Sequence, residues 1–357
     1  MRTKHMSFRE RRERLRKLLA ERALDALVVT YPSNRYYLSG FELHDVQFNE
    51  SSGTLVVTRS GRDYLITDGR YEDAARQFFS EDEIYIYRRN YIHTLNLVLS
   101  KCGVRIGFES DSVSARRAGL MQARRRLEPC NGLVERLRLH KDADEIAALK
   151  KSFALNHAML KWVPTILKEG MTERELAWQI ERYFRENGAS ELAFPSIVAF
   201  GGNAALPHAI PSERPLQENT GILLDVGCRV DSYCSDQTRS FWFGEKENDF
   251  FLLTRDIVAK VQEEVIKSME PGLPLSKLAW KAQHIFEDAG VADHFTHGLG
   301  HGVGLDTHEQ PSFNTGSKAA LEPGMTVTVE PGLYYTDKLG IRLEVTVLVE
   351  ENGITVL

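Results

Sequence analysis

The sequence has few cysteines, no long hydrophobic run and little net charge, and each shortage excludes a class of protein. Four cysteines in 357 residues are too few for a disulfide framework. No apolar run approaches the ~20 residues that a membrane-spanning helix needs, and the charged N-terminus lacks the apolar stretch of a signal peptide. A net charge of −5 provides no basic footprint for nucleic acid. We therefore expect a cytoplasmic protein with reduced thiols and with neither a membrane nor a nucleic-acid partner.

The residues that are present form an ordinary globular composition, with 42% hydrophobic and 27% charged residues. The length fits two domains of roughly 100–200 residues each. Strand-like runs, among them Leu24–Thr30, Arg35–Leu38 and Thr54–Thr58, alternate with helical stretches in the first part of the chain, which is typical of an α/β domain. We therefore expect an N-terminal α/β domain over 1–137 and a second domain over 138–357.

The second domain opens with a pattern of two helices. From Lys141 onward, apolar residues recur at helical spacing, and Pro164 should kink or end that helix. Thr172 and Glu175 fit a capping box that opens the next helix, and Gly188 supplies its C-terminal stop. The change from alternating strands to long helices indicates a change of domain.

The second domain also contains a diverged internal repeat. Leu176–Trp178 recurs as Leu278–Trp280 at an offset of 102, and His208–Pro211 aligns with His308–Pro311 at an offset of 100. Chance similarity between amphipathic helices would explain the first match but not the whole series in one order. We expect a duplicated α+β unit whose halves face each other and contribute two acids each to a site at the pseudo-twofold axis. These acids are Asp225, Asp236, Glu330 and Glu344.

Each of the four acids lies in or beside an apolar strand pattern. A carboxylate such as Asp225 is costly there unless it is paired or metal-bound. The polar turn that follows lets the chain return as a hairpin and bring Asp236 close, and two adjacent carboxylates need a cation or a proton. Alternation over Ile341–Val347 puts Arg342 and Glu344 on one face. One such acid is more often a strand-end or salt-bridged carboxylate, but four related by the repeat favour a metal site.

A cluster of histidines accompanies the acids. His297 and His301 lie among four glycines in Thr296–Leu305, and His308 follows seven residues after His301. Dense glycine lets the backbone approach a ligand closely. A glycine-rich phosphate loop is the alternative, but the segment lacks the lysine and the strand-then-helix setting of such loops. A lone histidine is more often structural, whereas His208 and these three beside four acids indicate a site.

Two Asp, two Glu and one His form an oxygen-rich ligand set with one nitrogen. Four carboxylates balance two divalent cations, and this set suits Mn, Co or Fe better than sulfur-preferring metals. Paired ions of this kind bridge a hydroxide and act in hydrolysis. We interpret Cys228 and Cys234 as two thiols on a buried hairpin rather than as ligands. The residues alone therefore predict a dinuclear metallohydrolase and leave its substrate open.

These motifs resemble the pita-bread metallopeptidases, specifically the Xaa-Pro branch of aminopeptidase P and prolidase. The resemblance covers the whole chain, including Pro32–Gly40, Thr67–Tyr71 and Leu133–Arg138 in the N-terminal domain. It implies an α/β creatinase/prolidase-like domain followed by an α+β pita-bread catalytic domain. It also implies a homodimer and two divalent metal ions, Mn first, with Co, Fe or Zn as alternatives. The implied metal ligands are Asp225, Asp236, His301, Glu330 and Glu344, with Asp236 and Glu344 bridging.

The resemblance further implies hydrolysis of the Xaa-Pro imide bond, at the N-terminus of peptides or in dipeptides, by a hydroxide that bridges the metals. Glu330 is the implied general base that accepts its proton. His308 is implied to stabilise the tetrahedral oxyanion or to guide a proton to the leaving nitrogen, and His208 to lie near the substrate on a mobile loop. The implied substrate-binding residues are His297, Tyr334 and Arg342.

The sequence departs from the family pattern at two positions. Ser312 stands where the family often has an arginine that helps to bind the free carboxylate of the substrate. This departure weighs against strict dipeptidase action and leaves longer Xaa-Pro peptides open. Val345 follows Glu344, where the family commonly has an aspartate after that glutamate. We expect the second departure to alter the surroundings of the ligand without removing it.

Two alternative functions remain at this stage. One is a pita-bread relative that acts on a small non-peptide molecule, since the shape of the pocket decides the substrate. The other is a catalytically silent binding protein of the same fold. Silent relatives usually lose ligands or the flanking histidines, and none of these is missing from this sequence. Metal content separates the binding protein from both enzymes, and a substrate panel separates the two enzymes.

Overall fold

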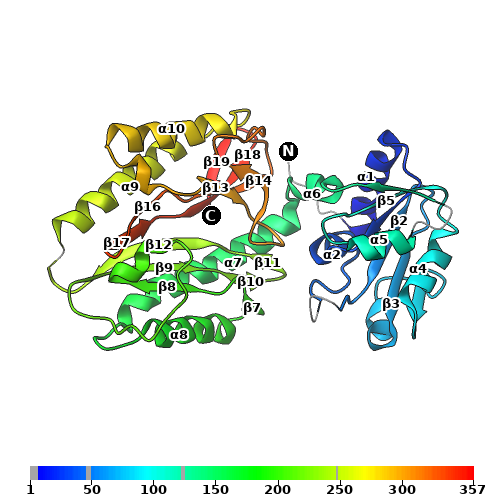
Figure 1. Cartoon of the computed structure of the whole chain (residues 1–357), viewed down its shortest axis with the longest axis horizontal. Helices are drawn as coiled ribbons and strands as arrows, with labels where there is room; N and C mark the ends of the chain where they lie inside the picture. Colours follow the sequence, from blue (N-terminus) through cyan, green and yellow to red (C-terminus); the bar gives the residue numbers. More distant parts are fainter. Residues whose placement is uncertain (1–6, 46–49, 122–124, 247) are drawn as a thin grey trace. The chain divides into compact units, whose positions relative to one another are not determined.

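A computed structural model describes residues 7–45, 50–121, 125–246 and 248–357. The chain forms two compact units, Lys4–Arg138 and Leu139–Leu357 (Figure 1). Among the described residues, no helix is both long and apolar enough to cross a membrane.

The N-terminal unit is built on one six-stranded sheet of order β4-β3-β2-β1-β5-β6. Strand β1 runs parallel to β5 and antiparallel to β2, so the sheet is mixed. The strands are β1 (Ala26–Val29), β2 (Thr54–Thr58), β3 (Tyr64–Asp68), β4 (Ile84–Tyr87), β5 (Arg105–Phe108) and β6 (Arg126–Pro129). The helices are α1 (Phe8–Glu21), α2 (Pro32–Ser39), α3 (Glu72–Ala75), α4 (Tyr91–Leu99), α5 (Ala115–Met121) and α6 (Leu133–Arg138), with a 3₁₀ turn η1 (Gly69–Tyr71).

The strand predicted over Arg35–Leu38 is wrong, because these residues lie in helix α2. Pro32 occupies the first turn, where its fixed φ favours a helix start, and Gly40 ends the helix with a left-handed φ of 76°. The side chains of Arg35 and Leu38 are both fully buried. Burial on more than one side of a short helix hides the helical period and leaves an apolar run that reads as a strand.

The C-terminal unit combines four long helices with several antiparallel sheets. The sheet orders are β12-β9-β8, β11-β10-β7, β14-β13-β15-β18-β19 and β16-β17. The helices are α7 (Ala143–Trp162), α8 (Glu173–Glu186), α9 (Asp249–Lys267) and α10 (Leu275–Asp288), and the 3₁₀ turns are η2 (Val163–Thr165), η3 (Gly201–Ala205) and η4 (Ala292–His294). The strands are β7 (Glu191–Leu192), β8 (Ile197–Phe200), β9 (Thr220–Val226), β10 (Cys228–Val230), β11 (Tyr233–Cys234), β12 (Gln237–Phe243), β13 (Gly300–Gly302), β14 (Glu309–Phe313), β15 (Thr326–Val329), β16 (Gly332–Tyr335), β17 (Leu339–Arg342), β18 (Val345–Glu350) and β19 (Gly353–Val356).

The two halves of this unit repeat the same construction. Helices α7 and α8 pack with β8 and β9 around one apolar cluster, whereas α9 and α10 pack with β15 and β18 around another (Figure 1). Isolated bridges recur just before α8 and α10, joining Thr172 to Pro215 and Pro274 to Ala320. The repeat in the sequence therefore corresponds to a repeat in the structure, and the strands of the two halves lie between the two helix pairs.

Candidate metal and active site

Strands β9 and β12 bring the first two acids together. The strands pair antiparallel with Val226 opposite Gln237, so Asp225 and Asp236 lie at the end of the strand pair where the chain turns back. Strands β10 and β11 connect the two strands at this end. Helix α7 fixes this end, because the buried Asn156 donates from Nδ2 to the carbonyl of Val226 at 2.8 Å. The two carboxylates thus reach one point from positions eleven residues apart.

The second half contributes its residues from three separate strand ends. His301 lies in β13, Glu330 directly follows β15, and Glu344 lies between β17 and β18. The alternating run over Ile341–Val347 is therefore two strands rather than one, with Glu344 at the break. Thr328 ties two of these elements together, since its Oγ1 accepts from the backbone N–H of His301 at 2.9 Å and donates to Glu330 at 3.2 Å.

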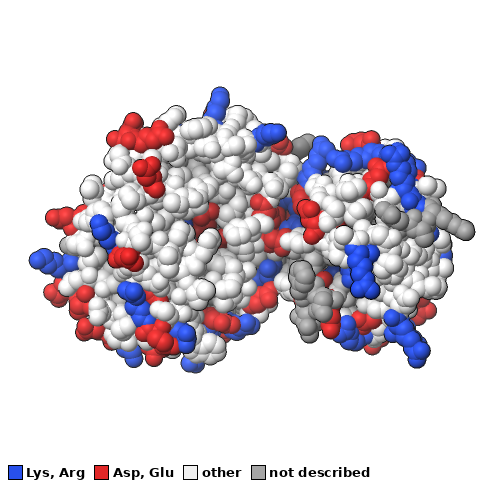
Figure 2. Space-filling model, viewed as in Figure 1, with Lys and Arg blue, Asp and Glu red and all other residues white. Residues whose placement is uncertain are grey.

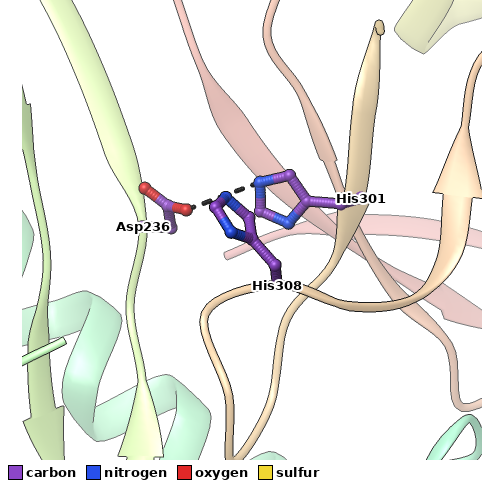
Figure 3. A group of neighbouring side chains, drawn as sticks. All are labelled: Asp236, His301 and His308. Atoms are coloured by element: carbon purple, nitrogen blue, oxygen red, sulfur yellow. Dashed lines mark ion pairs between the residues drawn. The ribbon is translucent and has the colours of Figure 1, made fainter. Parts of the chain in front are cut away.

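The five side chains and His308 lie close enough together to hold cations. Three overlapping groups have potential ligand atoms within 4.8 Å of one another. His301 Nε2 lies 3.7 Å from an Asp236 oxygen and 3.3 Å from a Glu330 oxygen. Figure 3 shows the imidazole of His301 pointing toward Asp236, with His308 beside both. The groups are Asp225, Asp236 and Glu344; His301, Glu330 and Glu344; and Asp236, His301 and His308.

The electrostatics of the cluster favour bound positive charge. Burial, together with the charges of neighbouring carboxylates, raises the pKa of Asp236 and of Glu344 well above their ordinary values. Burial likewise raises the pKa of Glu330 to about 8. The pKa values are raised because the carboxylates are buried and repel one another. A divalent cation would relieve that repulsion and would therefore bind strongly.

Three further observations show that the residues fit divalent metal ions. Asp225 Oδ1 and Glu344 Oε1 are buried and have no hydrogen-bond partner among the described residues. The carbonyl of Gly302 can only accept, so His301 donates to it from Nδ1 at 3.0 Å, and the Nε2 lone pair remains for a metal. Burial also lowers the pKa of His301 to about 4, which keeps the imidazole neutral as a ligand must be.

A hydrogen-bond network around Arg342 supports the cluster from one side. Arg342 Nη2 lies 2.6 Å from Asp225 Oδ2, and its Nη1 donates to the hydroxyl of Tyr334 at 2.6 Å. His297 contacts the same hydroxyl at 2.9 Å. Arg342 Nε donates to Thr238 Oγ1 at 3.0 Å, and Thr238 donates to Glu344 Oε2 at 2.7 Å. One guanidinium thus connects acids from both halves of the repeat.

Sequence reasoning missed Thr238 and Thr328, which orient the acids but carry no reactive group. A signal was available for Thr238, since it lies two residues after Asp236 and alternation places both on one side of the chain. A threonine in a strand is too common to single out on that ground alone.

The cluster forms one wall of a cavity of about 480 Å³. His208, His297 and His308 also line it, and the apolar lining residues, here called the apolar wall, include Phe194, Pro195, Ile197, Ile210 and Pro211. Ser312 is not among the described lining residues, and Arg342 is the one Lys or Arg among them. On the face shown in Figure 2, charged side chains of both signs are scattered over this unit, both at its outline and within it. The cavity therefore combines an acidic floor with apolar surface.

The cysteines lie apart from these groups. All four are free and buried, and burial raises the pKa of Cys234 to about 12. Cys234 Sγ approaches the carbonyl of Leu305 and the hydroxyl of Thr307. A thiol with so high a pKa is a poor metal ligand, because the thiolate is the form that binds.

Two family profiles match the chain, and between them they span nearly all of it. Residues 147–351 match metallopeptidase family M24, and residues 11–140 match the creatinase/prolidase N-terminal domain. The first match contains all five clustered side chains as well as His208, His297 and His308.

Individual proteins are similar over almost the full length. An uncharacterized peptidase from Staphylococcus epidermidis is 32% identical over 354 residues, covering 96% of this chain and 97% of that protein. A solved Xaa-Pro dipeptidase from Bacillus anthracis has a TM-score of 0.91 at 30% identity, covering 98% of this chain and 97% of that one. An X-Pro aminopeptidase from Thermotoga maritima has a TM-score of 0.86 at 30% identity, covering 97% and 96%. These similarities confirm the predicted fold class.

Proposed function

The chain belongs to metallopeptidase family M24, and we propose that it hydrolyses the Xaa-Pro bond at the N-terminus of peptides with the help of two divalent metal ions. The observation that carries the proposal is the set of four carboxylates and one imidazole on the floor of a cavity with an apolar wall. The solved relatives named above, an Xaa-Pro dipeptidase and an X-Pro aminopeptidase, support this choice of bond.

Five side chains would hold the metal ions, with one acid from each half shared between them. When bound, such ions supply Lewis acidity to the scissile carbonyl and lower the pKa of the attacking water. Manganese is our first candidate, since carboxylate ligands with one imidazole suit it. The proposed ligands are Asp225, Asp236, His301, Glu330 and Glu344, with Asp236 and Glu344 shared.

In this proposal, some side chains of the cavity transfer protons and others position the substrate. The carboxylate of Glu330 accepts the proton of the attacking water. The imidazole of His308, whose pKa burial lowers, is neutral at neutral pH and donates a hydrogen bond to the carbonyl oxygen as charge develops there, or guides a proton to the leaving nitrogen. His208 and His297 line the same cavity and contact the substrate, and Tyr334 orients His297.

The apolar wall suits a proline ring. An Xaa-Pro bond is a tertiary amide and offers no N–H for recognition, so packing has to provide the specificity. Phe194, Ile197 and Pro211 are positioned to give that contact. We therefore propose that the proline side of the bond lies against this wall, with the scissile carbonyl over the carboxylates.

We further propose a preference for peptides longer than two residues. The free carboxylate of a dipeptide would need a cation near the proline side of the bond. Arg342, the one Lys or Arg among the described lining residues, is already committed to Asp225 at 2.6 Å. This favours aminopeptidase P-type action over strict dipeptidase action. By the family resemblance, we also propose that the enzyme acts as a cytoplasmic homodimer.

A substrate panel tests the proposal. Metal-stripped protein is given back Mn, Co or Zn and assayed with Gly-Pro, Leu-Pro and Arg-Pro-Pro, with Arg-Ala-Ala as the matched peptide without proline. We expect cleavage of Arg-Pro-Pro, weak cleavage of the dipeptides and none of Arg-Ala-Ala. A preference for dipeptides would contradict the proposed length preference. Failure to cleave any of the proline peptides with metal bound would overturn the proposal and favour a non-peptide substrate.

A further inference from the structure

The loop over 201–212, which carries His208, is bound at both ends by the single carboxylate of Glu173. At the first end, Glu173 accepts from the backbone N–H of Phe200 at 2.7 Å and from Asn203 Nδ2 at 2.8 and 2.9 Å. At the other end, it accepts from the backbone N–H of Ser212 at 2.9 Å and from its hydroxyl at 2.6 Å. We propose that Glu173 is a positioning residue that holds His208 in the cavity, an inference that rests on the proposed function.

Glu173 is itself rigidly placed. It is fully buried at the first position of α8, where Thr172 caps the helix. The backbone N–H groups of Glu173 and Arg174 donate to the carbonyls of Arg214 and Ser212, each at 3.1 Å. The first turn of α8 therefore binds the C-terminal end of the loop. A buried carboxylate is costly without partners. All of the groups named above that donate to the Glu173 carboxylate belong to the loop or to the residues at its edges.

The middle of the loop is held by the active-site network. Arg342 Nη1 donates to the carbonyl of Pro207 at 3.2 Å, and Ala209 packs, 3% exposed, in a cluster with Tyr334. The side chain of His208 lies between these two supports and lines the cavity. The loop is thus anchored on Glu173 at both ends and on Arg342 beside His208.

The other half of the repeat shows that the carboxylate is not needed to build the helix start. The backbone N–H of Leu275, at the start of α10, donates to Ala319 at 3.0 Å, as that of Glu173 donates to Arg214. Leu275 is therefore the counterpart of Glu173, and it is apolar and fully buried. An acid at this position serves the half that carries the His208 loop, which points to a local role in holding that loop.

A double-mutant cycle tests the proposal with manganese-loaded protein and Arg-Pro-Pro. In Glu173→Gln one amide oxygen replaces two carboxylate oxygens, and the amide nitrogen faces the N–H donors of Asn203 and Ser212. We expect Glu173→Gln to lower kcat/KM about tenfold, since a misplacement near 1 Å costs up to ~10²-fold. In the His208→Ala background the same change should cost less than about threefold. Losses that multiply, or no loss in the single variant, would overturn the inference.

A second measurement does not depend on activity. Hydrogen exchange of the peptide over 200–212 should become at least about tenfold faster in Glu173→Gln, and faster to a smaller degree in Ser212→Ala, which removes one donor and leaves the core intact. Glu175→Gln on the same helix is the matched control, because glutamine still completes the capping box. If none of the proline peptides is cleaved, the proposed function fails, and hydrogen exchange alone tests whether Glu173 holds the loop. Faster exchange in Glu173→Gln would support that role, and unchanged exchange would overturn it.

Discussion

Asp236 and Glu344 are both almost fully buried, with 4% and 1% of their surface exposed, and both face other acids. Under the proposed ligand assignment, removing either carboxylate would remove a ligand that both metal ions share. We expect Asp236→Ala to lose the metal pair and at least ~10³-fold of the activity together, as measured by elemental analysis and peptide hydrolysis. Asp231→Asn is the control, since Asp231 is exposed on the β10–β11 turn, its ion pair among the described residues is with the exposed Lys151, and asparagine tolerates its left-handed φ of 49°.

His308→Ala separates catalysis from metal binding. This side chain lies beside His301, with ring centroids 4.2 Å apart, but is not one of the proposed ligands. Turnover should fall roughly 10²–10³-fold, because the proposed oxyanion donor would be lost, while the metal content should stay at the wild-type value. Full metal and full activity in Asp236→Ala, or lost metal in His308→Ala, would show that the ligands are assigned wrongly.

Glu109 gives the N-terminal unit a pH dependence. Its carboxylate accepts from the backbone N–H groups of Thr30 and Tyr31 and from Asn34 Nδ2 at 2.6–2.7 Å, yet burial raises its pKa from 4.5 to about 7. A carboxyl that holds its proton more tightly when folded stabilises the fold below about pH 4.5. That contribution, up to about 3 kcal/mol, is lost as pH rises to about 7.

Hydrogen exchange of β1 and β5, corrected for intrinsic rates, measures the effect of Glu109. The free energy of opening should fall between pH 5 and pH 8 in the wild type. In Glu109→Gln, which cannot titrate, this part of the fall should be missing. Equal falls in both proteins would mean that Glu109 has an ordinary pKa in the folded state.

The order and type of the acids could be predicted from the sequence, because the repeat relates Asp225 and Asp236 to Glu330 and Glu344. Their supports could not be predicted in the same way. Glu173 shares no sequence pattern with the loop that it binds, and two of the four groups that donate to its carboxylate are backbone N–H groups. Such contacts depend on where the chain returns in space, and a single sequence does not encode that in a local pattern.

At the scale of elements, helices α8 and α10 present the same side chains at matching positions. Phe184 and Phe286 are both fully buried, each in the core of its own half. We expect Phe184→Ala and Phe286→Ala each to lower the free energy of unfolding by about 3–5 kcal/mol, through lost burial and the cavity that remains. Urea unfolding followed by circular dichroism measures both changes.

The same two helices supply the controls for that prediction. Trp178 and Trp280 lie at another pair of repeat-related positions and are 61% and 47% exposed. Their alanine variants should stay within about 0.5 kcal/mol of the wild type. Large losses at the tryptophans, or small ones at the phenylalanines, would mean that the wrong face of each helix has been assigned to the core.

The long amphipathic helices and the short strand β2 could be predicted, whereas helix α2 and the strand break at Glu344 could not. The expected helix from Lys141 begins at Ala143 and gives way to a 3₁₀ turn containing Pro164, as proline requires. Helix α2 has only eight residues. Most of them are buried, so the sequence shows no apolar stripe with helical spacing. The break at Glu344 is likewise invisible, because alternation continues across it in the sequence while the backbone turns from β17 to β18.

At the scale of the whole molecule, fluorescence reports on one unit alone. All proposed ligands lie in Leu139–Leu357, and so do the four tryptophans, Trp162, Trp178, Trp242 and Trp280. A chelator should lower the fluorescence-monitored Tm by roughly 5–10 °C relative to protein with metal at ~100 times its Kd, since ligand binding stabilises only the folded state. The Tm of Asp236→Ala should not respond to the chelator, and a response there would place the metal elsewhere.

The two-part architecture and its fold class followed from local patterns and the family resemblance. The proposed preference for longer peptides draws on both levels, because Ser312 weighs against strict dipeptidase action in the sequence and the structure shows which cations line the cavity and what they already bind. Arg342 illustrates the difference, since the sequence shows a positive charge near the site and the structure shows that charge held by Asp225.

The central claim is that metal ions held by the clustered acids let this chain cleave an Xaa-Pro bond. The most direct test is a titration of chelator-treated protein with Mn²⁺ while the hydrolysis of Arg-Pro-Pro is followed. The rate should be near zero without metal, rise with added Mn²⁺ and level off at two equivalents per chain. A full rate of hydrolysis without added metal, or no hydrolysis at any Mn²⁺ concentration, would contradict the claim.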